Sequence, residues 1–221
     1  MKNYKDRSAY VFDMDGVLVD SATYHYESWC GIAERLGIDF TPELNENLKG
    51  ISRAESLDYI LSLKPDIELT THEKTALLVE KNDIYLDSIK SMNADSLLPG
   101  IAEVLTILKE KGKRLAIGSS SKNARYIAQL TSLDRWMEVI SDGTDIQRSK
   151  PDPQVFLIAA ERLGVQATDC VVIEDSASGV TAANSVDMLS IGIGAKEHLG
   201  HADKLVSDTA ELAQFIKQLY S

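Results

Sequence analysis

The spacing of hydrophobic positions divides the chain into a short strand, a long helical block and an alternating region. The apolar run at residues 9–12 is bounded by polar residues and predicts a buried strand. From about residue 20 to residue 95, apolar side chains recur at helical spacing and no strand pattern interrupts them. We predict helices near residues 53–62 and 71–89, preceded by another. The apolar face of that first helix contains Tyr26, Trp29, Cys30, Ala33 and Leu36.

Beyond residue 98 the pattern alternates between strands and helices. The predicted strands are 114–118, 139–141, 170–173, 189–193 and 204–206. The predicted helices are 101–111, 122–130, 152–163, 177–185 and 210–220. Such alternation favours a parallel sheet with helices on both faces. We therefore expect an α/β fold with a doubly wound, Rossmann-like core (1–19 and 97–221). It would carry an inserted helical cap (20–96), hinged where the chain crosses between them.

The composition and net charge limit the classes of molecule that the protein is expected to bind. With 44% hydrophobic residues the chain can bury a substantial core. The net charge of −11 argues against nonspecific binding to nucleic acid or an anionic membrane, but not against a local site for an anionic substrate. No run approaches the ~18 apolar residues of a membrane span. The two distant cysteines, Cys30 and Cys170, fit a reducing cytosol, and we expect a cytoplasmic monomer.

The first candidate for chemistry is the pair of aspartates that follows the first strand. Asp13 and Asp15 are spaced i, i+2, so their side chains point to the same side of an extended segment. They would lie at the carboxyl end of the strand, where open parallel sheets bind ligands. Two carboxylates there can share a divalent cation, and one can attack an electrophile while the other moves a proton. The alternative is an ordinary acidic turn, because Asp-Gly is common in turns.

Three further polar sets follow other predicted strands. Residues 119–123 (SSSKN) offer hydroxyls and amides to an anion, or simply cap a helix. Lys150, held before a proline, can neutralise a phosphate or remain a solvated lysine. Glu174 and Asp175 add oxygen ligands of the kind Mg²⁺ prefers, or form another acidic turn. Together the four sets supply a nucleophilic carboxylate, a carboxylate for proton transfer, a metal site and phosphate-binding cations. These groups are what phosphoryl transfer through an aspartyl-phosphate requires.

These four sets resemble the motifs of the haloacid dehalogenase superfamily, and the resemblance spans nearly the whole chain. Within it, the cap segments and two core segments are similar to the β-phosphoglucomutase group. The similar segments are DSATYHYESW (20–29), LKGISRAESL (48–57), EKND (80–83), LPGI (98–101), SKN (121–123) and SKPDP (149–153). SKPDP also occurs in phosphatase relatives, so the segment 48–57 discriminates best.

The resemblance implies roles for the core residues. Asp13 would be the nucleophile and a metal ligand. Asp15 would be the general acid and base, and its backbone carbonyl would bind one Mg²⁺ ion. Asp175 would bind that ion directly and Glu174 would hold its water. The transferring phosphoryl group would be gripped by Ser119 and Lys150.

The resemblance also implies roles in the cap and in the turn that faces it. The distal phosphate would be held by Arg53, Ser121, Lys122 and Asn123, with Gly50 in the same binding set. His25 and Lys81 would couple cap closure to catalysis. The implied reaction interconverts β-D-glucose 1-phosphate and glucose 6-phosphate, with β-glucose 1,6-bisphosphate as intermediate and activator. Three departures from the group, Val19, Ser21 and Ser120, affect no catalytic group but bear on cap closure and sugar preference.

Several other interpretations stay open at the level of sequence. His25 could be a surface or capping residue, Arg53 could pair with Glu55, and Trp29 fits a helix core better than a ligand contact. Asp142 is expected to be a solvated charge. The main functional alternative is a sugar-phosphate phosphatase of the same fold, without a firm grip on a distal phosphate. A noncatalytic sugar-phosphate sensor and a haloacid dehalogenase fit the four polar sets less well.

Overall fold

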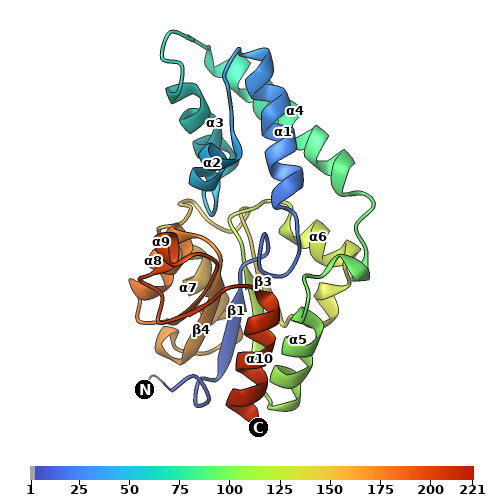
Figure 1. Ribbon diagram of the computed structural model, residues 1–221, viewed down its shortest axis with the longest axis vertical. Coiled ribbons are helices and arrows are strands. Elements are labelled where there is room, and N and C mark those ends of the chain that lie inside the picture. The colour runs from blue at the N-terminus through green and yellow to red at the C-terminus, as the bar shows by residue number, and fades with distance from the viewer. Residues whose placement is uncertain (1–2) are drawn as a thin grey trace.

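A computed structural model describes residues 3–221 and shows one six-stranded, fully parallel sheet with helices on both sides (Figure 1). The strand order is β3-β2-β1-β4-β5-β6, which confirms the predicted doubly wound α/β architecture. The strands are β1 (Ala9–Phe12), β2 (Arg114–Gly118), β3 (Val139–Ser141), β4 (Cys170–Glu174), β5 (Leu189–Ile193) and β6 (Lys204–Val206). The sheet helices are α5 (Ile101–Glu110), α6 (Ala124–Leu130), α7 (Gln154–Leu163), α8 (Ala177–Asn184), α9 (Lys196–Leu199) and α10 (Thr209–Tyr220).

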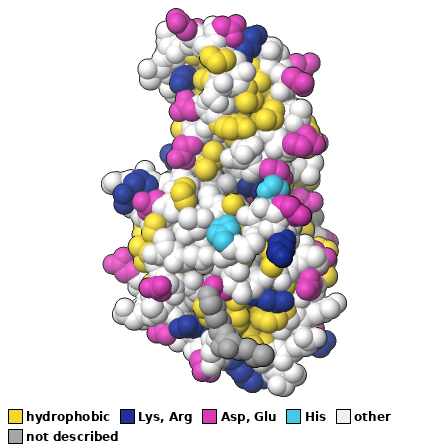
Figure 2. Space-filling view, turned by 60° about the vertical axis from the view of Figure 1, so that its left-hand side comes forward, with side chains coloured by type: hydrophobic (Ala, Val, Ile, Leu, Met, Phe, Trp, Pro, Cys, Tyr) yellow, Lys and Arg dark blue, Asp and Glu magenta, His cyan; other side chains and the backbone are white. Residues whose placement is uncertain are grey.

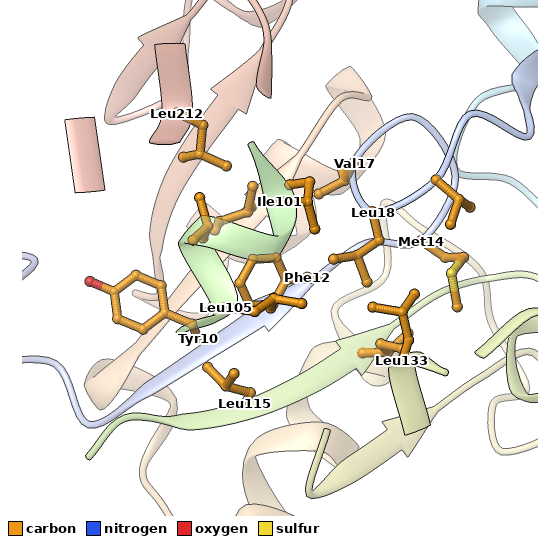
Figure 3. Packing of buried hydrophobic residues seen from close by; sticks show 14 of the residues in the cluster. Tyr10, Phe12, Met14, Val17, Leu18, Ile101, Leu105, Leu115, Leu133 and Leu212 are labelled. Atoms are coloured by element: carbon orange, nitrogen blue, oxygen red, sulfur yellow. The ribbon is translucent and has the colours of Figure 1, made fainter. Parts of the chain in front are cut away.

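Strand β1 is the centre of the sheet, and its side chains alternate between two hydrophobic cores. Tyr10 and Phe12 pack on the side covered by α5 and α10 (Figure 3). Ala9 and Val11 pack on the opposite side with apolar residues of α7 and α8. Because both faces are buried, every residue of β1 is apolar. Its carboxyl end, held between β2 and β4, is therefore a rigid position for the residue that follows, Asp13.

The segment between β1 and α5 contains helices joined by loops and no named strand, and its helices lie over the carboxyl ends of the strands (Figure 1). Its helices are α1 (Ala22–Arg35), α2 (Pro42–Asn45), α3 (Arg53–Ser62) and α4 (Thr71–Ile89). We refer to the part of this segment from α1 to α4 as the cap. It has its own apolar cluster, which includes Trp29 and Ile60. Capping boxes start two of its helices: Ser52 and Glu55 at α3, and Thr70 and Glu73 at α4.

The two connections between cap and sheet lie side by side. Val19 forms an antiparallel bridge with Leu97, and the Leu98 amide donates to the Leu18 carbonyl at 3.0 Å. The chain therefore leaves and re-enters the sheet region at one place, as a hinge requires. Among the described residues, no helix is both long and apolar enough to cross a membrane. Acidic side chains are spread over the face shown in Figure 2, in keeping with the net charge of −11.

Some details differ from the sequence prediction. Helices α6 and α7 each begin two residues later than expected, because tight turns at 121–123 and 151–153 precede them. The expectation that Asp142 is solvated was wrong. It is fully buried, accepts hydrogen bonds from both the amide and the hydroxyl of Thr144, and pairs with Arg125 at 3.0 Å. Cys30 and Cys170 are free thiols.

Candidate active site

A cavity of about 640 Å³ lies between the cap and the carboxyl ends of β1, β2 and β4. Its walls contain every predicted site residue except Lys150 and Glu174: Asp13, Asp15, His25, Gly50, Arg53, Lys81, Ser119, Ser121, Lys122, Asn123 and Asp175. The structure thus gathers residues that are up to 162 positions apart, from Asp13 to Asp175, around one space. Lys150 and Glu174 lie directly behind Asp13, as the next contacts show.

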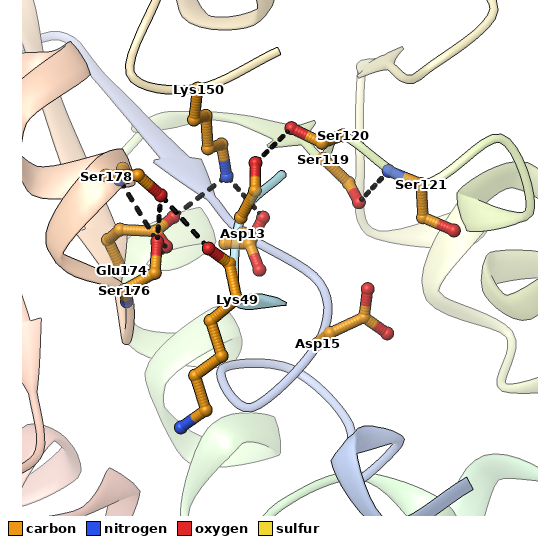
Figure 4. Close-up of polar contacts among 12 residues, drawn as sticks. Asp13, Asp15, Lys49, Ser119, Ser120, Ser121, Lys150, Glu174, Ser176 and Ser178 are labelled. Atoms are coloured by element: carbon orange, nitrogen blue, oxygen red, sulfur yellow. Dashed lines mark hydrogen bonds and ion pairs between the residues drawn. The ribbon is translucent and has the colours of Figure 1, made fainter. Parts of the chain in front are cut away.

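Asp13 is held by a buried lysine. The Lys150 ammonium lies 2.5 Å from Asp13 Oδ1 and 2.9 Å from Glu174 Oε2 (Figure 4). Burial and the neighbouring Glu174 carboxylate raise the pKa of Asp13 well above its usual value, although Lys150 opposes this shift. Burial alone would lower the pKa of Lys150, but the two carboxylates outweigh it and raise that pKa. Lys150 therefore stays charged and leaves the second Asp13 oxygen available to a reacting group.

Glu174 is already fully partnered. One oxygen accepts from Lys150, and the other accepts from the amide of Ser176 at 3.0 Å and from its hydroxyl. Gly179 makes room for this carboxylate, because a Cβ at that position would lie 2.1 Å from the Glu174 carboxyl carbon. With its oxygens occupied, Glu174 fits a supporting position better than direct ligation of a metal.

The carboxylates of Asp13, Glu174 and Asp175 offer oxygens within 4.8 Å of one another. Burial, and then the charge of Glu174, raises the pKa of Asp175 to about 7, although Lys49 opposes the shift. Several carboxylate oxygens this close together repel one another, and a hard divalent cation such as Mg²⁺, which prefers oxygen ligands, would relieve that repulsion. Gly16 permits the arrangement: it has φ +78°, and a Cβ there would lie 2.4 Å from Asp175 Oδ2.

Asp15 points toward the cap rather than toward the carboxylate cluster, and its contacts are with Ser21 and His25. Its Oδ1 accepts a hydrogen bond from Ser21 and lies 3.7 Å from His25 Nε2. His25 Nδ1 is in turn 2.8 Å from the Lys81 ammonium, and its ring stacks on Tyr85 at 4.0 Å. The cap thus orients the second aspartate through α1 and α4.

The hydrogen bonds and charges of these neighbouring residues favour the ionised form of Asp15. Burial opposes its ionisation, but His25 and Ser21 outweigh it and lower the pKa of Asp15. Burial, with Arg53 nearby, lowers the pKa of Lys81 to about 7. Burial likewise lowers the pKa of His25, and the charge of Lys81 adds to the effect. Asp15 is therefore negatively charged near neutral pH, which is the form of a carboxylate that can accept a proton.

The turn after β2, residues 119–123, is held in a compact form by its own hydrogen bonds. The Ser121 amide donates to Ser119 Oγ at 3.1 Å, and the Asn123 amide donates to Ser121 Oγ at 3.2 Å. The Asn123 side-chain amide reaches the cap and donates to Asn82 Oδ1 at 2.9 Å. Lys122 lies in the same turn and lines the cavity. Both backbone amides are thus used within the turn, and its serine hydroxyls and Lys122 are the groups placed beside the cavity.

Arg53 comes from the opposite, cap side. It is the first residue of α3, and its guanidinium donates to the Leu78 carbonyl of α4 at 2.9 Å. Glu55 is engaged elsewhere, in the capping box with Ser52, so the alternative Arg53–Glu55 pair does not form. The half-buried guanidinium faces the cavity with donors to spare, since a guanidinium has five.

The sequence reasoning missed several residues at this site. The Lys49 ammonium of the cap lies 3.2 Å from Asp175 Oδ2, and Tyr85 supports the His25 ring. Trp29, expected in the helix core, is indeed 2% exposed but also lines the cavity, where the Lys81 ammonium lies 5.2 Å from its ring centre. Lys49 lies within the segment 48–57, but nothing in its local spacing indicates the contact with Asp175, and Tyr85 is likewise 60 positions from His25.

Comparison with known proteins agrees with this geometry. The haloacid dehalogenase-like hydrolase family matches residues 8–187. The chain is 39% identical over 205 residues to the β-phosphoglucomutase of Bacillus subtilis (strain 168), covering 92% of this chain and 91% of that protein. It is 31% identical over 179 residues to a phosphorylated carbohydrates phosphatase of Thermotoga maritima, covering 80% of each.

A solved structure of β-phosphoglucomutase from Clostridium difficile superposes with a TM-score of 0.91. The two chains are 36% identical, and the match covers 97% of each. The resemblance noted in the motifs is thus confirmed along nearly the whole chain. The protein is an enzyme, and it belongs to the haloacid dehalogenase-like hydrolase family.

Proposed function

We propose that this enzyme is a Mg²⁺-dependent β-phosphoglucomutase. It would interconvert β-D-glucose 1-phosphate and glucose 6-phosphate through β-glucose 1,6-bisphosphate. One observation carries the proposal: a single cavity is lined both by Asp13 and by a second polar group whose chemistry suits an anion, Arg53 with Ser121–Asn123. A bisphosphate needs two such regions, whereas a monophosphate needs one.

The first half-reaction makes the aspartyl-phosphate. A carboxylate oxygen of Asp13 forms a bond to phosphorus while the bond from phosphorus to the sugar oxygen breaks. Asp15, in its protonated form, gives its proton to that sugar oxygen. Lys150 and Ser119 lie beside the reacting position and would hold the phosphoryl oxygens.

The second half-reaction reverses these roles on the other hydroxyl of the sugar. The Asp15 carboxylate takes the hydroxyl proton as the sugar oxygen attacks phosphorus, and the bond to Asp13 breaks. The lowered pKa of Asp15 favours this basic form. Between the two steps the bisphosphate must turn around, so each of its phosphates must fit both regions of the cavity.

The metal would be held by Asp13, Asp175 and the backbone carbonyl of Asp15, with Glu174 orienting its water. When bound, Mg²⁺ neutralises negative charge on the transferring phosphoryl group. The cluster of raised-pKa carboxylates supports this assignment. Glu174 fits its supporting role because Lys150 and Ser176 already occupy its oxygens.

We further propose that residues 20–96 act as a mobile cap domain on a core formed by 1–19 and 97–221. Closure would exclude water, which otherwise competes with the sugar hydroxyl for the aspartyl-phosphate. The adjacent connections at Val19 and Leu97 support a hinge there. We propose that the enzyme acts as a monomer. The free cysteines suit the cytoplasm.

The second candidate is a sugar-phosphate phosphatase. The Thermotoga maritima relative supports it, because a phosphatase would use the same four core sets. The Arg53 guanidinium in the cavity favours the mutase, since hydrolysis does not require a distal grip. A noncatalytic sensor is disfavoured because binding alone needs neither Asp13 nor Asp15.

The deciding experiment supplies β-glucose 1-phosphate, a trace of β-glucose 1,6-bisphosphate and Mg²⁺ to the purified protein. Glucose 6-phosphate and free phosphate are then measured in the same reaction. The mutase proposal expects glucose 6-phosphate in large excess over phosphate. Phosphate as the main product would establish the phosphatase instead, and neither product would refute both.

A further inference from the structure

Two serine hydroxyls of the core, neither used in the chemistry above, hold neighbouring carbonyl groups of the cap. Ser120 Oγ donates to the Gly50 carbonyl at 2.7 Å. Ser178 Oγ donates to the Lys49 carbonyl at 3.1 Å, the contact drawn between these residues in Figure 4. The two acceptors are consecutive in the chain, so a single cap loop is fastened at two points.

The two serines belong to the two core loops that carry the chemistry. Ser120 lies between Ser119 and Ser121 in the turn after β2. Ser178 lies in the first turn of α8, three residues after Asp175. One fastening point is therefore on the phosphate side and the other on the carboxylate side.

The fastened loop leads directly into Arg53. It joins the short 3₁₀ helix Glu46–Leu48 to α3, whose first residue is Arg53. The fit is close at Gly50, where φ is +78° and a Cβ would lie 2.4 Å from Ser178 Oγ. The loop approaches the core so closely that its backbone, rather than a side chain, makes the contact.

We propose that Ser120 and Ser178 form a two-point latch that stabilises the closed cap and positions Arg53 over the reacting centre. They are positioning residues, because their hydroxyls act through the loop that precedes Arg53. The latch is suited to repeated opening: it consists of neutral hydrogen bonds, and water can replace both donors when the cap leaves. Its kinetic consequences rest on the proposed mutase function, whereas the latch itself does not.

The magnitude follows from the nature of the bonds. A neutral intramolecular hydrogen bond contributes a modest net free energy, which corresponds to about a 2- to 10-fold change in an equilibrium. Each hydroxyl should therefore shift cap closure by about that factor. Because both bonds hold the same loop, their effects should be coupled rather than independent.

The test compares Ser120→Ala, Ser178→Ala and the double variant with the wild-type protein. The matched control is Ser185→Ala. Ser185 directly follows α8, and its hydroxyl donates to the Ala182 carbonyl at 2.7 Å, within the core. Amide hydrogen exchange is followed in full-length protein with Mg²⁺ and inorganic phosphate. The reporting segment is 46–57, and helix α10 serves as the reference for global unfolding.

The latch predicts about 2- to 10-fold faster exchange in residues 46–57 for each single variant and more for the double variant, with α10 unchanged. The control should match the wild type in both segments. Unchanged exchange at 46–57 in the double variant would overturn the latch. Equal acceleration in α10 would also overturn it, because the serines would then stabilise the fold as a whole.

A kinetic measurement separates the latch from the proposed function. In the double variant, phosphate release from acetyl phosphate should rise relative to glucose 6-phosphate formation, and KM for β-glucose 1-phosphate should rise more than kcat falls. A wild-type protein without mutase activity would refute the proposed function, while the exchange result would still decide the latch. Faster exchange without any rise in that hydrolysis ratio, in an active mutase, would overturn the positioning role.

Discussion

The Lys150 ammonium lies 2.5 Å from Asp13 Oδ1; both side chains are buried, Asp13 in the wall of the cavity and Lys150 behind it. The same ammonium contacts Glu174 at 2.9 Å. One lysine is thus paired with both the proposed nucleophile and the proposed support of the metal site. Because the pKa of Lys150 is raised, its stabilising charge persists through the neutral range and is lost only in strong alkali.

Replacement of this lysine should therefore cost stability as well as activity. Lys150→Met leaves Asp13 and Glu174 as unpaired buried anions, which should lower the free energy of unfolding by about 3–5 kcal/mol near neutral pH. The deficit should shrink as pH falls, because protonation of Asp13, whose pKa is already raised, removes the unpaired charge. Urea unfolding at several pH values measures this.

The matched control for that variant is Lys74→Met. Lys74 pairs with Asp58 at 2.7 Å on the exposed surface of the cap, so its loss should cost about 1 kcal/mol or less. Similar losses in both variants, or a deficit in Lys150→Met that does not depend on pH, would contradict the buried-pair interpretation.

Asp13→Asn should abolish turnover without unfolding the protein. An amide cannot form the acyl-phosphate, and removal of a nucleophile costs several orders of magnitude in rate. The fold should survive, because the neutral side chain suits a position where the pKa of the carboxyl is already raised. Circular dichroism measures whether the fold survives, and the rate of product formation measures turnover. The control is Asp58→Asn, which makes the same change at an exposed residue of the cap outside the cavity. A purified variant with substantial remaining activity would show that another residue carries the phosphoryl group.

Mg²⁺ binding should weaken as pH falls. Asp175 must be ionised to bind the metal, and its pKa is raised to about 7. Protons should therefore compete, and the apparent Mg²⁺ affinity should drop at least about tenfold between about pH 8 and about pH 6. Titration calorimetry of the ligand-free protein measures this directly. Asp175→Ala should weaken binding by at least about tenfold and reduce the pH dependence. Unchanged titrations in that variant would mean that the metal binds elsewhere.

Strands and helices could be predicted from the sequence where the spacing of apolar residues within the element determines its structure. The apolar run of β1 is buried on both faces, and the periodicity of α1, α3 and α4 matches helices that share one apolar cluster. Elements of about one turn, such as α2 and α9, are too short to show a period, so they were not predicted. The turn at 121–123 delays the start of α6 because hydroxyl acceptors compete with the helix for its first amides.

How far the positions of site residues could be predicted depended on how far apart their partners lie along the chain. Residues that directly follow strands, such as Asp13 and Ser119, could be placed because parallel strands end at one edge of the sheet. Contacts across the cavity could not. The Lys49–Asp175 pair joins the cap to the residue after β4, and the buried Asp142 pairs with Arg125, which is 17 positions away in α6. Neither pair shows a local spacing that sequence can reveal.

Arg53 provides the sharpest separation of mutase from phosphatase. Arg53→Ala removes the guanidinium that would hold the distal phosphate, and the loss of such charged hydrogen bonds should reduce mutase activity about 10- to 100-fold. Phosphate release from acetyl phosphate should fall much less, because that donor has no distal phosphate. The control is Arg35→Ala, whose guanidinium pairs with Glu80 on the cap surface, and both activities should remain at wild-type levels. An equal fall in both activities of Arg53→Ala, or no change in either, would assign Arg53 a structural role and favour the phosphatase.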